Sequence, residues 1–168
     1  MAFTEMNIHD LSFNPFDKIN NQWMLITAGD EQASNTMTAS WGGLGIMWNK
    51  NVATIYVRPQ RHTKKFLDAN EKLTLSFLSD DLKAEKTKAG RITGAEVADK
   101  WAAIGLTPAI IDGVAAVEEA EMVFVCKKLY AQDMKPECFT VGELDEKNYP
   151  NKDYHMMYIV EIEKVVVK

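Results

Sequence analysis

The chain has 168 residues, of which 46% are hydrophobic and 26% charged, and this is the composition of a globular domain with a real hydrophobic core. Its net charge of −5 argues against binding of nucleic-acid phosphates by the whole surface. No apolar run reaches the roughly 18 residues of a membrane-spanning helix, and residues 1–10 lack the basic and apolar regions of a secretory signal. We therefore expect one cytoplasmic domain over residues 1–168. The two cysteines are too few for a disulfide framework and are expected to be buried or half-buried free thiols.

Short segments rich in β-branched and aromatic residues, bounded by turn-forming residues, predict strands in the first half of the chain. The predicted strands are residues 21–28, 36–41, 52–57 and 73–78. The second strand enters a glycine-rich run at residues 42–45, and Pro59 follows the third. A short helix is predicted over residues 62–69, ended by Asn70.

The middle of the chain predicts helices over residues 82–88 and 95–104. In the second of these, apolar residues beginning at Val97 recur at i, i+4 and i+7, and Gly105 follows as a C-terminal stop. Long strands are predicted over residues 121–130 and 156–167, separated by an acidic, turn-forming stretch.

Strands dominate both ends of the chain without a strand–helix–strand alternation, which argues against a doubly wound parallel sheet. The pattern favours a mainly β fold, an antiparallel barrel with a few appended helices, because closure removes exposed strand edges.

The stretch from residue 32 to residue 67 contains no Asp or Glu. At the frequency of the whole chain, 24 acids in 168 residues, about five would be expected there. The same stretch carries the basic residues Lys50, Arg58, Arg61, Lys64 and Lys65. This composition indicates a local site for an anion in an otherwise acidic protein.

Residues 61–65 (RHTKK) place this positive charge at the start of the predicted helix. A helix N-terminus already carries partial positive charge and free N–H donors, so cations are unfavourable there. A bound phosphate would resolve the conflict, with arginine as a bidentate donor and Thr63 as a hydroxyl donor. A solvated basic surface helix is the alternative.

Residues 36–41 (TMTASW) alternate small hydroxyl side chains with bulkier ones and lead into the glycines. Such hydroxyls and strand-edge amides can donate to a flat heteroaromatic ring, and glycine lets backbone approach it closely. The same pattern also occurs as plain structure, so by itself it leaves the question open.

Several common catalytic patterns are absent from the sequence. There is no dinucleotide-binding glycine fingerprint, phosphate-binding P-loop or nucleophile elbow, and the three histidines lack metal-ligand spacing. An anion site without an obvious acid or nucleophile suits a protein that uses the chemistry of a cofactor.

Motifs along nearly the whole chain, in order, resemble the flavin reductase-like family of FMN-binding split β-barrels, which includes flavoredoxins. They are residues 35–41, 58–63, 75–77, 99–101, 105–108, 119–120, 126–127, 153–155 and 161–162. The resemblance implies an antiparallel split β-barrel and a homodimer with FMN near the subunit interface. Many relatives carry a Ser-Gly-Arg-Asp type of turn where this chain reads TGAEVADK over residues 93–100, so this chain lacks that Arg-Asp pair and any contact it makes.

The resemblance also implies a set of FMN-binding residues. Those expected at the flavin ring and ribityl chain are Thr38, Ala39, Ser40 and Trp41, with the adjoining Thr36 and Met37. Those expected around the phosphate are Arg58, Arg61, His62, Thr63 and Lys64, and Ser76 and Phe77 are expected near the ring or ribityl hydroxyls. His155 resembles a histidine beside the flavin in some members and is the candidate catalytic residue, positioning a nicotinamide or substrate. No metal site is expected.

Three hypotheses follow. The first is an FMN-dependent oxidoreductase that passes electrons from NADH or NADPH through flavin to free flavin, a metal chelate or a protein. The second is a non-enzymatic FMN electron carrier reduced by a protein donor, which would dock on apolar residues near the glycine run. The third is a module that binds a phosphate ligand without flavin.

Overall fold

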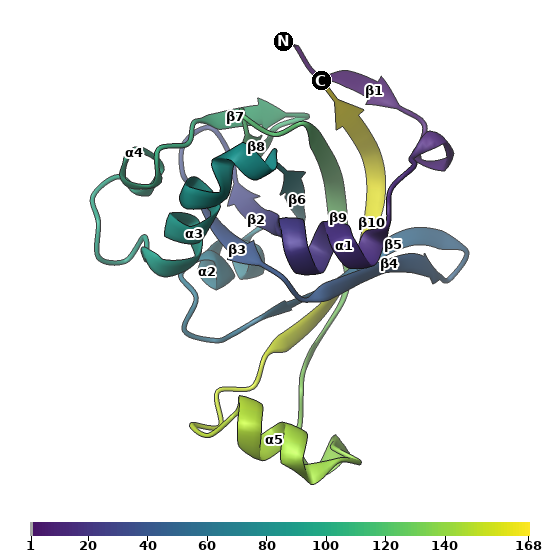
Figure 1. The fold of residues 1–168 in the computed structure, drawn as a ribbon, viewed down its shortest axis with the longest axis vertical. Coiled ribbons are helices and arrows are strands. Elements are labelled where there is room, and N and C mark those ends of the chain that lie inside the picture. Colours follow the sequence, from purple (N-terminus) through teal and green to yellow (C-terminus); the bar gives the residue numbers. More distant parts are fainter. Residues whose placement is uncertain (1) are drawn as a thin grey trace.

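The computed structural model describes residues 2–168, and its strands form one strongly bent antiparallel sheet with a small hairpin beside it (Figure 1). The strand order in the large sheet is β3-β2-β6-β9-β10-β5-β4, and β1 pairs with the C-terminal end of β10. The strands are β1 (Thr4–Met6), β2 (Met24–Gly29), β3 (Ser34–Ala39), β4 (Gly42–Met47), β5 (Lys50–Val57), β6 (Lys72–Phe77), β7 (Pro108–Ile111), β8 (Val114–Val117), β9 (Met122–Asp133) and β10 (Met156–Val167). The predicted mainly β, antiparallel fold is confirmed, and β3 and β4 remain at the two ends of the strand order.

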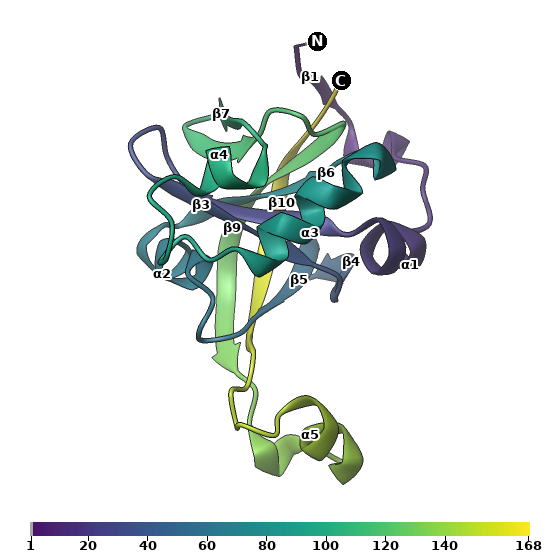
Figure 2. The ribbon, with the colours of Figure 1, turned by 60° about the vertical axis from the view of Figure 1, so that its left-hand side comes forward.

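Short helices connect and cover the strands. They are η1 (Ile8–Asp10), α1 (Pro15–Asp17), η2 (Lys18–Gln22), α2 (Thr63–Ala69), η3 (Asp80–Leu82), α3 (Lys83–Arg91), α4 (Lys100–Ile104), η4 (Pro136–Cys138) and α5 (Gly142–Asn148). Figure 2 shows α2, α3 and α4 on the side of the molecule where β3 lies. None of the helices among residues 2–168 has the length and apolar character needed to cross a membrane.

The alternating side chains of the central strands enter two hydrophobic cores. On β2, Ile26 packs with Ile55 and Phe124 inside the bent sheet. Its neighbour Leu25 points to the other face and packs with Ile104 and other residues beneath α3, α4 and β8. Because successive strand residues face opposite sides, β2 is buried along its whole length.

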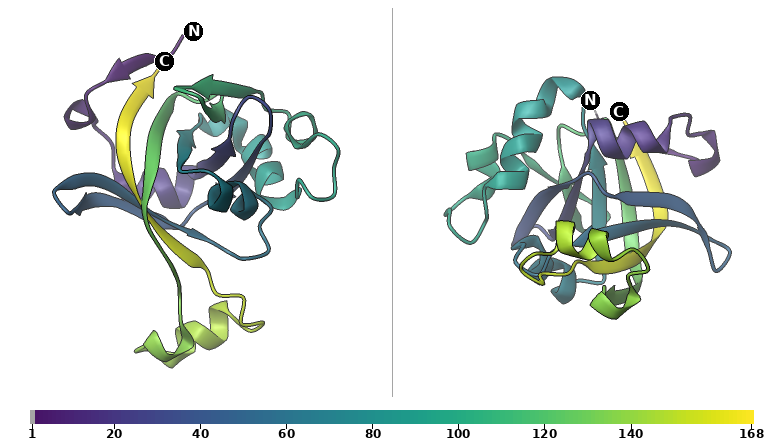
Figure 3. Two further views of the ribbon diagram at one scale, coloured as in Figure 1. Left: turned by 180° about the vertical axis from the view of Figure 1, so that it is seen from behind. Right: turned by 60° about the horizontal axis from the view of Figure 1, so that its bottom comes forward.

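The distal ends of β9 and β10 carry residues 134–155 away from the rest of the molecule, and we call this segment the arm (Figure 3). The arm contains α5 and an aromatic cluster in which the Tyr149 ring lies 4.8 Å from that of Tyr154 and 5.9 Å from that of Phe139. The arm returns to β10 through His155, so its packing positions residues at the start of that strand.

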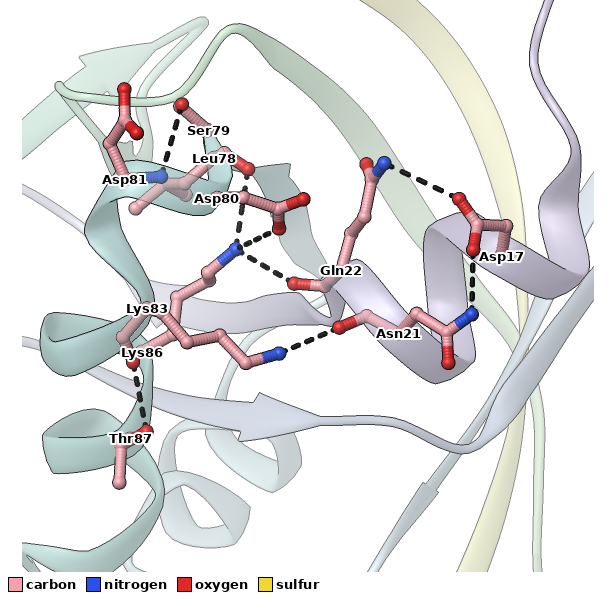
Figure 4. Close-up of polar contacts among 10 residues, drawn as sticks. All are labelled: Asp17, Asn21, Gln22, Leu78, Ser79, Asp80, Asp81, Lys83, Lys86 and Thr87. Carbon is pink, nitrogen blue, oxygen red and sulfur yellow. Dashed lines mark hydrogen bonds and ion pairs between the residues drawn. The ribbon is translucent and has the colours of Figure 1, made fainter.

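Lys86 attaches α3 to the chain that precedes β2 (Figure 4). Its side chain is fully buried, and the ammonium group donates to the carbonyls of Gln22 at 2.8 Å and Leu78 at 3.4 Å, with Asp80 Oδ1 also at 3.4 Å. Burial is the main cause of the lowered pKa of Lys86, and Asp80 opposes it. This anchoring holds α3 against β3, which matters because α3 carbonyls accept hydrogen bonds from candidate site residues.

Several sequence expectations were wrong in detail. The strand predicted from residue 21 begins at Met24, because residues 18–22 are helical and Trp23 adopts a positive φ of 68°. The glycine-rich run is strand β4, paired with β5. The helix predicted from residue 95 begins only at Lys100, since Asp99 caps it through the amide of Ala102 at 3.1 Å.

Three further features differ from the sequence predictions. The hairpin of β7 and β8 was missed, although its Asp112-Gly113 turn is a hairpin signal. The acidic stretch before β10 contains helix α5. Both cysteines are free, as expected, but Cys138 is exposed, whereas Cys126 is buried.

Candidate functional site

Two adjoining cavities lie where β3, the end of β5, the start of α2 and the start of β10 meet. The β3 cavity, about 260 Å³, is lined by Met37, Thr38, Ala39, Ser40, Trp41, Tyr56, Arg58, Arg61 and His155. The α2 cavity, about 230 Å³, is lined by Met37, Arg58, Gln60, Arg61, His62, Thr63, Ile92, Thr93 and Lys100. Because they share Met37, Arg58 and Arg61 as walls, the structure brings most of the predicted ring and phosphate residues into one region.

The alternation of β5 explains how two of these side chains reach the cavities. Ile55 and Val57 are fully buried in the core, so Tyr56 and Arg58 point to the opposite face of the strand. The chain then turns into α2, where the amide of Arg61 donates to the carbonyl of Arg58 at 3.1 Å. This turn places both arginines beside the shared wall.

Neither cavity is lined by a carboxylate, whereas Arg58, Arg61 and Lys100 contribute to the linings. The site therefore carries positive charge. The charge of Arg58 is compensated, because it forms a 2.8 Å ion pair with Asp153 and donates to the carbonyl of Asn148 at 2.9 Å. Gln60 donates to the same carboxylate at 2.7 Å. The arm therefore holds Arg58 in place and neutralises part of its charge.

Arg61 and Lys100 are cations without an acidic partner among residues 2–168. Arg61 donates to the carbonyl of Gly90, and the buried Lys100 donates to the carbonyl of Thr36, each at 2.5 Å. Burial, with a smaller contribution from Arg61, lowers the pKa of Lys100 to about 8. Burial and then Arg58 lower the pKa of the Arg61 guanidinium. A buried or half-buried cation whose hydrogen bonds go only to carbonyls is unfavourable, so Lys100 and Arg61 are suited to a bound anion.

The residues at the start of α2 have different environments. His62 lies 5.6 Å from the ring of Phe66, and burial followed by Lys65 and Lys100 lowers its pKa. Thr63 is buried, and its hydroxyl accepts from the amide of Asn35 at 2.7 Å.

At the ring end of the predicted site, aromatic and small polar side chains meet. Trp41 lies tilted against His155 with the ring centroids 5.3 Å apart. The hydroxyl of Thr38 donates to the carbonyl of Lys86 on α3, so its proton is already used within the protein. The Ser40 hydroxyl, in contrast, has no hydrogen-bond partner in the part of the chain that the structure describes.

His155 is buried, and its Nδ1 lies 2.7 Å from the hydroxyl of Tyr149 on the arm. Burial is the main cause that lowers its pKa to about 4, and Arg58 adds to the effect. The imidazole is therefore neutral at pH 7.

Four predicted site residues lie outside the cavities. Thr36 is buried and shares a 2.8 Å hydrogen bond with Thr27. The Ser76 hydroxyl accepts from the amide of Val117 at 3.4 Å, and the Phe77 ring packs 5.2 Å from that of Phe124 in the core. Lys64 forms a 2.6 Å ion pair one turn along its own helix. The structure does not bring these four side chains to the cavities.

Sequence reasoning missed four polar lining residues: Tyr56, Gln60, Thr93 and Lys100. A strand period of two from Arg58 indicates Tyr56, and a cation at the first position of a helix, directly after its cap Asp99, indicates Lys100. No sequence signal distinguishes Gln60 or Thr93. Residues 93–100 lack the Arg-Asp pair of many relatives, but the segment still lies at the site. Its first residue, Thr93, and its last, Lys100, both line the α2 cavity.

A larger cavity of about 450 Å³ lies next to the α2 cavity, between the β2–β3 turn and α4. Asp30, Glu31 and Asp99 line it. Because these carboxylates would repel a phosphate, the smaller pair of cavities is the better anion site. No group of three or more His, Cys, Asp or Glu side chains within residues 2–168 is arranged to hold a metal ion.

Comparison with known proteins points to a flavin reductase-like domain, both by sequence and by structure. The family model described as flavin reductase like domain matches residues 16–167. No protein of curated function matches the chain. The FMN-binding domain of a flavin reductases-like enzyme from Shewanella baltica has a similar structure, with a TM-score of 0.71 and 14% identity over 99% of this chain and 77% of that one.

Two other solved structures are also similar to this one over nearly the whole chain. Flavoredoxin of Desulfovibrio vulgaris has a TM-score of 0.67 and 20% identity over 98% of this chain and 77% of its own. A putative flavin reductase with a split barrel domain from Shewanella frigidimarina has a TM-score of 0.67 and 18% identity over 100% of this chain and 80% of its own. These structures show that the open, bent sheet is a split-barrel fold.

Proposed function

Because this chain belongs to the flavin reductase-like family, we propose that its two cavities together hold FMN and that the protein is an FMN-dependent oxidoreductase. The α2 cavity takes the phosphate, and the β3 cavity takes the ring system. The observation that carries the proposal is the pair of acid-free cavities in which Arg61 and Lys100 have no carboxylate partner within residues 2–168.

The donor set fits a phosphate monoester. Arg61 and Lys100 supply charge-assisted hydrogen bonds, each worth about 1.5–3 kcal/mol. Gln60 and Thr93 add polar side chains on the same lining. The phosphate in turn supplies the counter-charge that the burial of these two cations requires.

The β3 cavity fits a planar ring. Trp41 and His155 supply aromatic surface, and Ser40 and Tyr56 supply hydroxyl groups on the same lining. When bound, FMN supplies the electron-transfer chemistry, while the residues of this chain bind and orient it. Cationic groups nearby favour negative charge on a ring in this cavity by preorganised electrostatics. His155 is the candidate catalytic residue because it is the histidine that lines the β3 cavity, where its neutral imidazole can exchange a hydrogen bond with a ligand.

The proposed reaction takes electrons from NADH or NADPH and passes them to free flavin, a metal chelate or a protein acceptor. The test is anaerobic mixing of the purified, FMN-loaded protein with each nicotinamide while the flavin absorbance is followed. Bleaching by either donor supports the oxidoreductase. A flavin that stays oxidised with both donors rejects this form of the proposal.

A second candidate is a non-enzymatic FMN electron carrier, and an exposed apolar surface favours it. Ile46 is 69% exposed, Trp48 52% and Trp41 48%, all on β4 or at its ends. Exposed apolar surface of this kind is a docking surface for a protein donor. If the FMN-loaded protein is not reduced by NADH or NADPH but is reduced by a ferredoxin-like donor, the result supports this second function.

The same exposed surface supports a homodimer, which we propose as the solution state. The measurement is the mass of the FMN-loaded protein by light scattering after gel filtration, with the visible spectrum recorded on the same peak. A colourless protein that takes up no added FMN would reject both flavin functions and leave a phosphate-binding module. A monomeric mass would reject the dimer alone.

A further inference from the structure

A buried hydrogen bond within the arm reaches the β3 cavity at His155. Tyr149 is 4% exposed and His155 8% exposed. The phenol oxygen lies 2.7 Å from the imidazole Nδ1, and the two rings meet edge to face with centroids 5.5 Å apart. The contact therefore joins Tyr149, inside the arm, to His155, the last residue of the arm, which lines the β3 cavity.

The direction of this hydrogen bond follows from the protonation of both groups. The charged groups around His155 are Arg58, Arg61 and Asp153, and burial together with the two arginines keeps the imidazole neutral at pH 7 by lowering its pKa to about 4. Burial raises the pKa of Tyr149 above its ordinary value, so the phenol keeps its proton. A neutral imidazole has one N–H and one acceptor nitrogen.

The phenol proton has two acceptors within reach. One is the imidazole Nδ1 at 2.7 Å, and the other is the thioether Sδ of Met134 at 3.6 Å. Thioether sulfur is a weak acceptor, whereas a short contact to an aromatic nitrogen is a strong one. Tyr149 therefore donates to His155, and the imidazole proton lies on Nε2.

We propose that Tyr149 is a positioning residue that fixes His155 as its Nε2–H tautomer, so that the β3 cavity receives a hydrogen-bond donor. The Nε2 atom has no partner among residues 2–168 and is not among the buried unpaired atoms, so it is open to a ligand. In this tautomer His155 donates to an acceptor atom of the bound ring and does not act as a base at that atom. The identity of the ring as flavin rests on the proposed function, whereas the tautomer does not.

The experiment is nitrogen NMR of the protein labelled with ¹⁵N-histidine, recorded with and without FMN. The chain has three histidines, and His155→Gln assigns the signals of interest. The expected result is a protonated, pyrrole-type Nε2 and an acceptor, pyridine-type Nδ1. In Tyr149→Phe the acceptor nitrogen loses its donor, the tautomers mix, and the pKa of His155 rises by about half a unit to one unit.

Tyr154→Phe is the matched control. It removes the same atom from the same aromatic cluster, but the Tyr154 hydroxyl donates to Asp145 at 2.8 Å and not to His155. We expect this variant to leave the tautomer and the pKa of His155 unchanged.

Two results would overturn the proposal. One is a wild-type Nδ1 that carries the proton, and the other is a Tyr149→Phe signal with the wild-type tautomer and titration. The wild-type measurement needs no variant, so it stands even if Tyr149→Phe fails to fold. Because it is made on flavin-free protein, its failure is separate from a failure to bind FMN.

Discussion

Replacing Lys100 with methionine tests whether its buried charge serves an anionic ligand. Methionine keeps most of the side-chain volume and removes the ammonium group, which has no acidic partner among residues 2–168. If Lys100 contacts the phosphate, the variant loses one charge-assisted hydrogen bond of about 1.5–3 kcal/mol. At about 1.4 kcal/mol for each tenfold change, FMN affinity falls about 10- to 150-fold.

The stability of the flavin-free variant should not fall with the affinity. Burial lowers the pKa of Lys100 from 10.5 to about 8, so holding it charged at pH 7 costs about 1–2 kcal/mol after allowance for solvent screening. Loss of its hydrogen bond to the Thr36 carbonyl offsets about 1 kcal/mol of that gain. We expect an unfolding free energy equal to that of the wild type or higher by about 1 kcal/mol.

The assay is titration of flavin-free protein with FMN and with riboflavin, together with urea unfolding. Lys65→Met is the matched control, because Lys65 is an exposed lysine at the start of α2 that lines neither cavity. It should change FMN affinity by less than about threefold. Equal losses for FMN and riboflavin in Lys100→Met would refute the reasoning, as would unchanged FMN binding.

Because the pKa of Lys100 is lowered, we expect both FMN affinity and native stability to depend on pH. In flavin-free protein Lys100 loses its proton around pH 8, so FMN binding above that pH requires proton uptake. Wild-type affinity should fall by up to about tenfold for each pH unit above 8, and Lys100→Met should lack this slope. Between pH 8 and 10.5 the unfolded chain binds more protons at this site than the native protein does. The site therefore raises native stability with pH in that window, and a flat stability difference between the two proteins would contradict the assignment.

Two further substitutions, each with a matched control, separate binding from folding. Arg61→Ala should weaken FMN binding about 10- to 100-fold with little change in riboflavin binding. Lys64→Ala should change FMN affinity by less than about threefold, because the charge of Lys64 is paired within α2. Similar losses of FMN and riboflavin affinity in Arg61→Ala would place the phosphate elsewhere. Lys86→Ala removes the donor from a part-buried carbonyl, that of Gln22, and from a buried one, that of Leu78, and should lower the unfolding free energy by about 2–4 kcal/mol. Lys88→Ala, at an exposed position of the same helix, should stay within about 0.5 kcal/mol of the wild type by urea unfolding, and equal effects would remove the structural role of Lys86.

The strands with the strongest local pattern could be predicted from the sequence. β10 begins and ends at the predicted residues, and β5 differs only by two residues at its start. Both are rich in β-branched residues, whose packing favours extended backbone. The weak elements could not be predicted in this way: β4 contains three glycines and depends on its pairing with β5.

The predicted positions of Ser76 and Phe77 show why alternation alone is insufficient. A strand with one wet face would place one of the two toward a ligand. In β6 both faces are covered, one by the core inside the sheet and the other by β8 and its neighbours. Tertiary packing buries both side chains, whatever their polarity.

By itself, the sequence determined that one stretch of the chain, residues 32–67, carries cations without acids. Which of those charges are available was decided only by the tertiary structure. Arg58 pairs with Asp153 from the arm, and Arg61 does not pair with an acid among residues 2–168. The second unpaired cation that lines the cavities, Lys100, comes from outside the stretch, since α4 packs beside β3. Ion pairing depends on distances of a few ångströms between segments far apart in the chain, and only the folded protein fixes those distances.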